Sequence, residues 1–370
     1  MKRRLRVLLL FGGRSAEHDV SRVTAVAVAR ALDPDRYDVV PVGITTDGRW
    51  LLAGDALALL EAGRDALPRA FDVAGEPVLA LSDPSHATLV PVAGDSTPFE
   101  VDVVLPLLHG PYGEDGTVQG LLELAGLPYV GSGVLGSAIG MDKIAMKRMF
   151  AAAELPQPRY LTHRDGHDPS VAAARAVREL GLPLFVKPAN LGSSVGVSKA
   201  HDEAELDAAI ADAAEYDEWV LVEEAVEGRE IEVAVLGDDP PEASVPGEVV
   251  PGAEFYDYAD KYEHDAAELL VPAPLDGDRA TEVRELAVRA FDACRAEAMA
   301  RVDFFFEEGG RGFLVNELNT IPGFTPISMY PRLWEASGLS YARLVDRLIE
   351  QALARHDRRS RRAGRQRPLD

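Results

Sequence analysis

The chain has 370 residues, 47% of them hydrophobic, and a formal net charge of −23. Its length exceeds what one hydrophobic core usually holds, so we expect two or three domains. The acidity argues against a nucleic-acid partner, and the chain has no run of about 18 apolar residues that would indicate a membrane partner. The single cysteine, Cys294, excludes an intramolecular disulfide framework and is interpreted as a small core residue.

The first 44 residues predict the opening of a doubly wound α/β domain. Residues 6–11 form an apolar strand, and a Gly12-Gly13 turn leads to a helix from about Ser15 to Leu32. A second strand is expected over 37–44, which completes a β-turn-α-β order. The apolar run at the start is short and lacks a cleavage site, so we interpret it as a buried strand and expect a cytoplasmic protein.

The rest of this half contains another buried strand and a loop rich in turn residues. The strand covers residues 101–108 and leads into His109-Gly-Pro-Tyr-Gly-Glu-Asp-Gly116. Residues 53–98 are rich in Ala, Gly, Asp and Pro, and we interpret them as peripheral structure.

From about Met141 the pattern changes to shorter elements. In chain order we expect a helix over 142–153, a strand over 184–187 followed by a Gly/Ser loop, a helix over 203–214, strands over 219–223 and 230–236, a polar loop over 256–270, a helix over 281–300, and strands over 301–306 and 313–319.

Domain boundaries are placed near residues 140 and 228. They give an N-terminal domain over 1–140, a central domain over 141–228 and a C-terminal domain over 229–354. Residues 355–370 carry seven arginines against two acidic residues. We expect this basic tail to be disordered.

Three oxygen-bearing side chains near the C-terminus are candidates for a metal site. Glu317 and Asn319 are two residues apart in a strand-like run, so both side chains leave the same face. Asp303 lies in a strand-like stretch that could pair alongside. Hard oxygen ligands suit Mg²⁺ bound together with substrate phosphates, which points to phosphoryl transfer. The plainer alternative is a solvated polar face on an edge strand.

Lysine is scarce, with six in the whole chain, and two of the six lie in unusual motifs. Lys187 ends a strand and precedes the small-residue loop Asn190 to Gly196, whose backbone N–H groups can form an anion-binding nest. Lys143, at the start of a helix, is a candidate for a second phosphate contact. The plainer alternatives are a hairpin turn and a surface lysine. The chain contains no Walker A sequence.

Gly131-Ser-Gly133-Val-Leu-Gly136 fits the glycine pattern of dinucleotide-binding folds. That pattern belongs in the first βα unit, with an acidic residue closing the next strand about 20 residues later. Here it lies in mid-chain, and the segment near residue 155 is turn-like. We therefore favour a structural turn over an NAD site.

Taken together and in order, six motifs resemble those of D-alanine–D-alanine ligases in the ATP-grasp superfamily. The motifs are Gly12 to Ser21, His109 to Gly116, Gly131 to Lys143, Lys187 to Gly196, Arg301 to Asp303, and Asn316 to Thr320. The resemblance implies a three-domain ATP-grasp protein of the α/β class. Its N-terminal domain would be a doubly wound α/β domain that binds substrate, and the central and C-terminal domains would form the ATP-grasp unit, with α+β character in the C-terminal parts. The resemblance also implies ATP and metal ions between the central and C-terminal domains, and a homodimer.

The resemblance assigns residues to ATP and to metal ions. For ATP they are Lys143 and Lys187 at the phosphates, Glu223 and Val226 at the adenine, Glu230 at the ribose, and Asn316 in the same site. For two Mg²⁺ (or Mn²⁺) ions they are Asp303, Glu317 and Asn319, with Glu317 bridging.

The resemblance also assigns residues to two D-alanine molecules, which would react through an acylphosphate. The assigned residues are Glu17 and His109 at the first D-alanine, Ser193 between Glu17 and Tyr262, Lys261 at the transferred phosphate, Ser328 at the carboxylate of the second, and Arg301 with the Gly323 N–H group at the oxyanion. The loop over 256–270 would exclude water. Its segment Tyr258 to Tyr262 resembles enzymes that use an amine nucleophile rather than a hydroxyl.

Four alternatives stay open. Another ATP-grasp ligase could join a different carboxylate to a different amine, or the second substrate could be D-lactate or D-serine. Glu17, His109 and Ser328 discriminate here, because they contact the substrate rather than ATP. A nucleotide-binding protein without catalysis would not need Arg301 beside a complete metal set, and an NAD-dependent dehydrogenase rests only on the glycine pattern.

Overall fold

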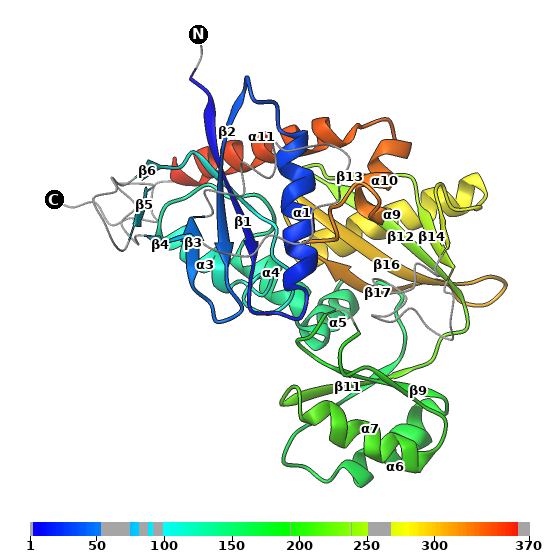
Figure 1. Ribbon diagram of the computed structural model, residues 1–370. Helices are drawn as coiled ribbons and strands as arrows, with labels where there is room; N and C mark the ends of the chain where they lie inside the picture. Colours follow the sequence, from blue (N-terminus) through cyan, green and yellow to red (C-terminus); the bar gives the residue numbers. More distant parts are fainter. Residues whose placement is uncertain are drawn as a thin grey trace.

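The computed structural model describes residues 3–52, 75–80, 88–91, 99–192, 194–237, 239–250 and 268–361. The strands in these ranges form three sheets, and Figure 1 shows that the smallest sheet lies apart from the other two. The expected α/β class is confirmed. No helix in the described ranges is long and apolar enough to cross a membrane.

The N-terminal sheet has a parallel centre with an antiparallel extension. Strand β1 (Leu5–Gly12) lies between β2 (Tyr37–Ile44) and β7 (Val103–Pro106) and is parallel to both. Central parallel strands are covered on both faces, which explains why β1 is apolar without alternation. Helix α1 (His18–Ala31) packs against β1. The predicted strand-helix-strand opening is therefore confirmed.

The extension of this sheet falls partly within the segment interpreted as peripheral. It adds four strands in antiparallel pairing, namely β3 (Trp50–Leu52), β4 (Glu76–Ala80), β5 (Thr88–Pro91) and β6 (Phe99–Glu100). Residues 53–74, 81–87 and 92–98 lie outside the described ranges.

The central sheet is small and antiparallel. It has the order β10-β9-β11-β8, with β8 at Tyr160–Arg164, β9 at Leu184–Pro188, β10 at Ser198–Ala200 and β11 at Trp219–Glu224. Helices α6 (Pro169–Leu180) and α7 (Glu203–Ala214) pack on it. Neither β8 nor α6 was predicted, although Asp168 caps α6 and Pro169 starts it, which is a common helix-start signal.

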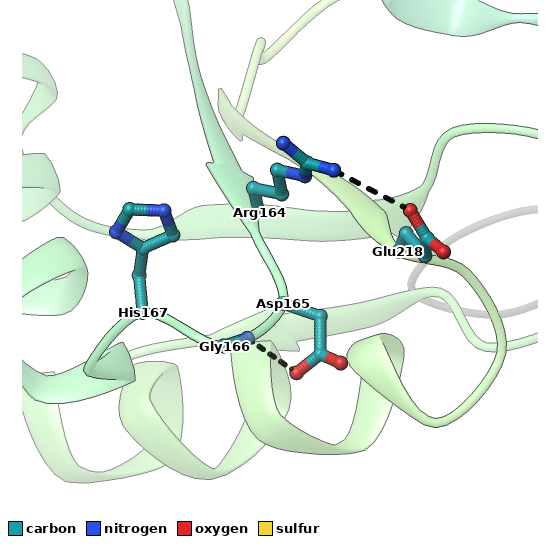
Figure 2. A pocket seen from close by; sticks show the side chains of 5 residues that line it. All are labelled: Arg164, Asp165, Gly166, His167 and Glu218. Carbon is teal, nitrogen blue, oxygen red and sulfur yellow. Dashed lines mark hydrogen bonds and ion pairs between the residues drawn. The ribbon is translucent and has the colours of Figure 1, made fainter.

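Figure 2 shows an open hollow at the far end of this sheet. Arg164 and Glu218 lie across it with 3.9 Å between Nη2 and Oε2, and Asp165 accepts a hydrogen bond from the Gly166 N–H group at 2.7 Å. None of the predicted site residues lines this hollow. We therefore assign it no part in the site.

The third sheet carries the C-terminal motifs. Its order is β15-β14-β12-β16-β17 with β13 paired to β12, and the strands are β12 (Arg229–Leu236), β13 (Glu242–Ala243), β14 (Gly247–Val250), β15 (Glu268–Leu270), β16 (Met299–Glu307) and β17 (Gly312–Asn319). Helix α9 (Gly277–Ala293) and helix α5 (Lys143–Ala152) pack on one face of this sheet, and the buried Cys294 lies in the same core.

Two expectations in this region are wrong. The helix predicted over 281–300 runs from Gly277 to Ala293, because Asp276 caps it earlier and Arg295 and Ala298 adopt positive φ angles that end it. The polar loop predicted to reach residue 270 ends earlier, because β15 begins at Glu268. Most of that loop, residues 251–267, lies outside the described ranges.

The mid-chain glycines pack a helix against the third sheet. Helix α4 (Val134–Met141) follows Gly133, and Gly136 and Gly140 lie one turn apart on it. A Cβ atom on Gly136 would lie 2.5 Å from the carbonyl oxygen of Arg295, and one on Gly140 would lie 2.8 Å from Cγ2 of Thr320. Only glycine permits this approach, which gives the pattern a packing function.

The C-terminal segment is more ordered than predicted. After α10 (Met329–Ala336), helix α11 extends from Tyr341 to Ser360 and so covers the first six residues of the expected disordered tail. The contacts of Arg355 explain why the helix continues into this tail. The Arg355 side chain is 4% exposed and donates to the carbonyl oxygens of Gly131 at 2.5 Å and Tyr129 at 2.6 Å.

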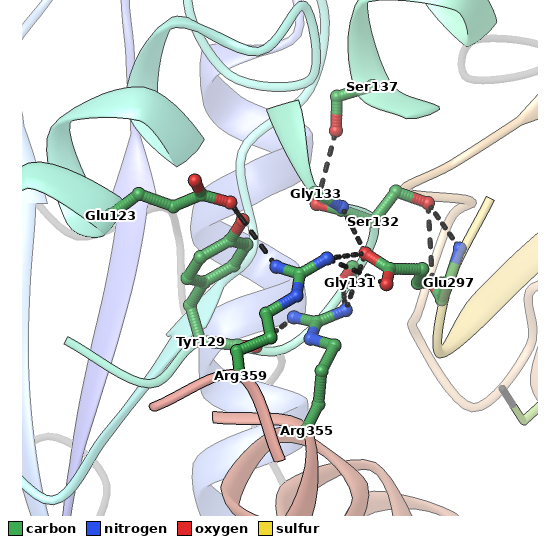
Figure 3. Close-up of polar contacts among 9 residues, drawn as sticks. All are labelled: Glu123, Tyr129, Gly131, Ser132, Gly133, Ser137, Glu297, Arg355 and Arg359. Carbon is green, nitrogen blue, oxygen red and sulfur yellow. Dashed lines mark hydrogen bonds and ion pairs between the residues drawn. The ribbon is translucent and has the colours of Figure 1, made fainter. Parts of the chain in front are cut away.

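Glu297 completes this junction (Figure 3). Its carboxylate accepts from the Gly133 N–H group at 3.1 Å, at the start of α4, and pairs with Arg355 and Arg359. Arg359 also contacts Glu123 at the end of α3 (Thr117–Leu124). The junction therefore fixes α4 between the N-terminal sheet and α11.

Candidate functional site

The C-terminal motifs meet on one face of β16 and β17. These strands are antiparallel, with Asp303 opposite Glu317 and Arg301 opposite Asn319. All four residues are half-buried, whereas Val302, Phe304 and Leu318 point into the core. The predicted pairing of the two strand-like stretches, and the common face of Glu317 and Asn319, are both present.

A β-bulge at Asn316 makes this arrangement possible. Val315 pairs with Phe304 and Glu317 with Asp303, so Asn316 is the extra residue in β17. Side chains alternate along a strand, so without the bulge Glu317 would share the core face of Phe313 and Val315. The extra residue moves Glu317 and Asn319 to the open face.

Arg301 bridges two carboxylates on this face. Its guanidinium donates to both oxygens of Asp303, each at 2.7 Å, and Nε lies 3.1 Å from Oε2 of Glu232 on β12. Burial alone would lower the pKa of Arg301, but Asp303 and Glu232 raise it well above its ordinary value. Arg301 is therefore a fixed cation beside the predicted metal ligands.

Two lysines enter the site from the start of α5. Asp142 caps this helix by accepting from the Ala145 N–H group, and Lys143 and Lys147 follow one turn apart on the same side. Lys143 Nζ donates to the carbonyl oxygen of Leu191 in the glycine-rich loop. Burial lowers the pKa of Lys143, and the nearby carboxylate of Glu317 opposes this.

Lys187 and Lys147 share one buried carboxylate. Lys187 Nζ donates to Oε2 of Glu223 at 2.7 Å, and Lys147 Nζ forms an ion pair with Oε1, without the alignment of a hydrogen bond. Burial would raise the pKa of Glu223, but the two ammonium groups lower it below its ordinary value. Burial lowers the pKa of Lys147, whereas Glu223 raises that of Lys187.

The segment between the central and third sheets holds the predicted adenine and ribose contacts. Glu223 is the last residue but one of β11, Val226 lies in the connection, and Glu230 is the second residue of β12; Val226 and Glu230 are half-buried. Glu224 points elsewhere, because its carboxylate pairs with Arg159 at 2.7 Å and also with Arg311. The two adjacent acids therefore have different surroundings, and only Glu223 joins the lysines.

Glu17 and His109 lie together at the edge of the N-terminal sheet. A Cβ atom on Gly110 would lie 3.6 Å from Oε2 of Glu17, and one on Gly192 would lie 3.5 Å from the same atom. The glycine-rich loop thus reaches the start of α1. His109 is 5% exposed, and its Nδ1 donates to the carbonyl oxygen of Ile321 at 3.1 Å.

The tautomer of His109 follows from this contact. Because a carbonyl oxygen only accepts, Nδ1 carries the proton and Nε2 has a lone pair. Burial lowers the pKa of His109, and the charge of Glu17 opposes this. Nε2 is buried and has no hydrogen-bond partner among the described residues.

Gly323 and Ser328 lie next to each other beyond β17. A Cβ atom on Gly323 would lie 3.2 Å from Oγ of Ser328, and Ser328 is the N-cap residue of α10. Its Oγ also contacts Oγ1 of Thr325 at 2.7 Å. A helix N-terminus with a hydroxyl group suits a carboxylate ligand.

Three predicted site residues cannot be placed. Ser193, Lys261 and Tyr262 lie outside the described residues. The others come from three groups of elements. Glu17 and His109 come from the N-terminal sheet, Lys143 comes from α5, and the remainder come from the central sheet, the third sheet and the start of α10.

Sequence reasoning missed three charged residues of this site. They are Lys147, Glu232 and Glu114, and all three are buried. Oε1 of Glu114 accepts from the Gly110 N–H group at 2.7 Å. Burial, followed by the charges of Glu17 and Glu317, raises the pKa of Glu114 to about 8. The one available signal was spacing, because Lys147 lies four residues after Lys143 and Glu232 two residues after Glu230.

The donor set fits a hard divalent cation. Asp303 and Glu317 supply carboxylates and Asn319 an amide oxygen on one face, which is the chemistry that Mg²⁺ prefers when phosphates complete its shell. Within the described residues no group of three or more His, Cys, Asp or Glu side chains has metal-site geometry. The predicted ligand set has the amide of Asn319 as its third member, so it differs from a cluster made of His, Cys, Asp or Glu alone.

Comparisons with known proteins match nearly the whole chain. The family model described as the N-terminus of D-ala D-ala ligase matches residues 6–132, and the one described as its C-terminus matches residues 149–350. A D-alanine–D-alanine ligase of Streptomyces griseus is 51% identical, over 96% of this chain and 94% of its own length. One of Nocardia farcinica is 50% identical, over 96% and 99%.

Solved structures agree with these relatives. The VanG D-Ala:D-Ser ligase from Enterococcus faecalis superposes with a TM-score of 0.83 at 34% identity, covering 95% of this chain and 100% of that one. A D-alanine-D-alanine ligase from Coxiella burnetii has a TM-score of 0.82 at 35% identity, with 96% of each chain covered.

Proposed function

The chain belongs to the D-alanine–D-alanine ligase family, and on that premise we propose that it joins two D-alanine molecules into D-alanyl-D-alanine with ATP. One observation carries the proposal. The face of β16 and β17 presents Asp303, Glu317 and Asn319 beside the half-buried cations Arg301 and Lys143. Such a face suits the transfer of a phosphoryl group to a carboxylate. The dipeptide would serve peptidoglycan precursor synthesis.

ATP would lie between the central and third sheets. Lys143 and Lys187 contact its phosphates as point charges, Glu223 and Val226 contact the adenine, and Glu230 the ribose. Both lysines are held by partners in the present structure, Lys143 by Leu191 and Lys187 by Glu223. ATP binding therefore requires Lys187 to exchange a carboxylate for a phosphate.

Two divalent cations, Mg²⁺ or Mn²⁺, would be held by Asp303, Glu317 and Asn319, with Asn316 on the adjacent bulge. They would neutralise the charge of the transferred phosphoryl group. Asp303 now accepts both of its hydrogen bonds from Arg301. Oε2 of Glu232 lies 3.1 Å from Nε of Arg301, the same atom that donates to Asp303, so Arg301 keeps a partner when Asp303 turns to a cation.

The two D-alanine molecules would lie between the N-terminal sheet and α10. The carboxylate of Glu17 would attract the ammonium group of the first D-alanine, and Nε2 of His109, which is buried and has no hydrogen-bond partner among the described residues, would act there as an acceptor. Ser328 and the N-terminus of α10 receive the carboxylate of the second. Ser193, Lys261 and Tyr262 complete this proposal from outside the described residues.

The ligation itself proceeds in two steps. The carboxylate of the first D-alanine attacks the terminal phosphorus of ATP, which gives an acylphosphate and ADP. The amine of the second D-alanine, once deprotonated, then attacks the acyl carbon, and phosphate leaves. Arg301 and the Gly323 N–H group would stabilise the oxyanion that forms in between.

The decisive experiment mixes purified protein, Mg²⁺, ATP and D-alanine and follows phosphate release together with the dipeptide. We expect both in equal amounts. Folded protein that forms no dipeptide would overturn the proposal. Because one structural relative is a D-Ala:D-Ser ligase, D-serine and D-lactate should be added as competitors. We expect D-alanine to be the preferred acceptor.

Three further properties complete the proposal. The chain acts in the cytoplasm, it forms a homodimer, and its domains are bounded near residues 140 and 228. Sedimentation analysis of the purified protein tests the dimer.

A further inference from the structure

Lys147 is a buried cation that the proposed mechanism does not use. It lies on α5, one turn after Lys143, and its side chain is 1% exposed. Among the described residues its one ion-pair partner is Glu223, and its Nζ also lies 5.6 Å from the centroid of the Tyr160 ring. A fully buried ammonium group is costly, so its presence needs a reason.

The reason lies in how the Glu223 carboxylate is shared. Oε2 is taken by Lys187 and Oε1 by Lys147, and the Glu223 side chain is also 1% exposed. One lysine would be enough to neutralise one carboxylate. The one carboxylate in direct contact thus has two ammonium partners, and the next carboxylates whose charge reaches these lysines are Glu317 and Glu230. A second buried lysine on the same carboxylate is unfavourable unless one of the two is needed elsewhere.

We propose that Lys147 is the permanent counter-ion of Glu223, and thus a positioning residue that keeps this carboxylate ionised and in place when Lys187 turns to the ATP phosphates. The inference rests on the proposed nucleotide site. Lys187, with 13% of its side chain exposed, is the more accessible of the two cations. Lys147 is enclosed by α5, β8 and β11, so it stays with Glu223.

The ionisation of Glu223 decides which base it recognises. A carboxylate accepts hydrogen bonds, and the 6-amino group of adenine donates one. Without Lys147, the departure of Lys187 would leave a buried, unpaired carboxylate, which would take up a proton. A protonated carboxyl group also carries an O–H donor, which suits the 6-oxo group of hypoxanthine, and its remaining oxygen is a weaker acceptor for the adenine amino group than a carboxylate is. Lys147 therefore sets the preference for ATP over ITP.

The test measures the dissociation constants of Mg-ATP and Mg-ITP by calorimetry, without D-alanine, for Lys147→Met and for Arg148→Met. Arg148 is the matched control, because it is the next residue on α5 and is exposed. We expect ATP to bind about 30-fold more weakly to Lys147→Met. ITP should change less than about threefold, and Arg148→Met should match the wild type. Lys147→Arg should regain most of the ATP affinity.

Equal losses of ATP and ITP affinity, or no loss of either, would overturn the proposal. Should Lys147→Met fail to fold, the double variant Lys147→Met/Glu223→Gln carries the test, because it removes the Lys147–Glu223 ion pair as a whole and leaves the partly accessible Lys187 beside an amide oxygen. We expect it to unfold cooperatively in urea but to lose the preference for ATP, since an amide both donates and accepts. A retained preference would refute the inference. Wild-type protein that binds neither nucleotide would instead refute the proposed function.

Discussion

The buried carboxyl group of Glu114 predicts a specific dependence of stability on pH. It is 8% exposed, and burial together with Glu17 and Glu317 raises its pKa from 4.5 to about 8. The folded state therefore binds this proton more tightly than the unfolded state. The resulting stabilisation is fully present below pH 4.5 and is lost as the pH rises through 8.

The size of the loss follows from the two pKa values. Between pH 5 and pH 8.5, the free energy of unfolding should fall by about 4 kcal/mol through this group alone. Glu114→Gln keeps the oxygen that accepts from Gly110 and cannot ionise, so it should lack this slope. The variant should therefore match the wild type at pH 5 and exceed it by about 4 kcal/mol at pH 8.5.

Urea unfolding of both proteins at the two pH values measures this difference directly. The comparison cancels all other titrating groups, because they are common to both chains. Glu335→Gln, on the exposed face of α10, is the matched control and should show no pH-dependent difference from the wild type. If the Glu114→Gln variant differs from the wild type by the same amount at both pH values, the carboxyl group is not protonated in the folded state.

Three further predictions concern the metal face and the packing around α4. Glu317→Gln should lower dipeptide synthesis about a hundredfold or more while the circular dichroism spectrum stays unchanged, and near-normal turnover would contradict the metal assignment. Arg355→Met should lower the free energy of unfolding by about 3–5 kcal/mol, because it leaves two carbonyl groups unpaired. Arg359→Met, at a side chain 29% exposed, should lower it by less than about 1 kcal/mol. Equal losses in urea unfolding would refute the role given to Arg355 in the junction. Gly136→Ala should destabilise by about 1–3 kcal/mol, because its Cβ atom would meet the Arg295 carbonyl group, while Gly277→Ala, with open space around it, should be neutral in the same assay.

The sequence predicted those elements whose signals are local. Apolar runs bounded by turns marked β1 and β2 correctly, and the start of α5 was placed within one residue of Lys143. The end of α9 was missed because Arg295 and Ala298 adopt positive φ angles that residue type does not announce. Helix α6 was missed although Asp168 and Pro169 announced it. The order of Arg355 was missed because its partners lie more than 200 residues away.

The site shows the same division. The spacing of Glu317 and Asn319 predicted a common face, but the bulge at Asn316 that turns this face outward depends on the register with β16. Lys147 and Glu223 are separated by helices α6 and α7 and by three strands, so no local pattern relates them. Glu114 lies within the motif from His109 to Gly116, but its raised pKa depends on burial, which only the packed structure supplies.

Two cations of this site, Lys187 and Arg301, are paired with acidic side chains in the structure. Lys187 is held by Glu223, and Arg301 by Asp303. Each must exchange a carboxylate for a phosphate or an oxyanion, and the exchange would strand a buried charge unless a second partner stays behind. The structure provides that partner twice, since Lys147 remains with Glu223 and Glu232 remains with Arg301. Substrate binding therefore exchanges ion pairs that already exist and leaves no buried charge unpaired, which explains why residues outside the ligand contacts are buried and charged.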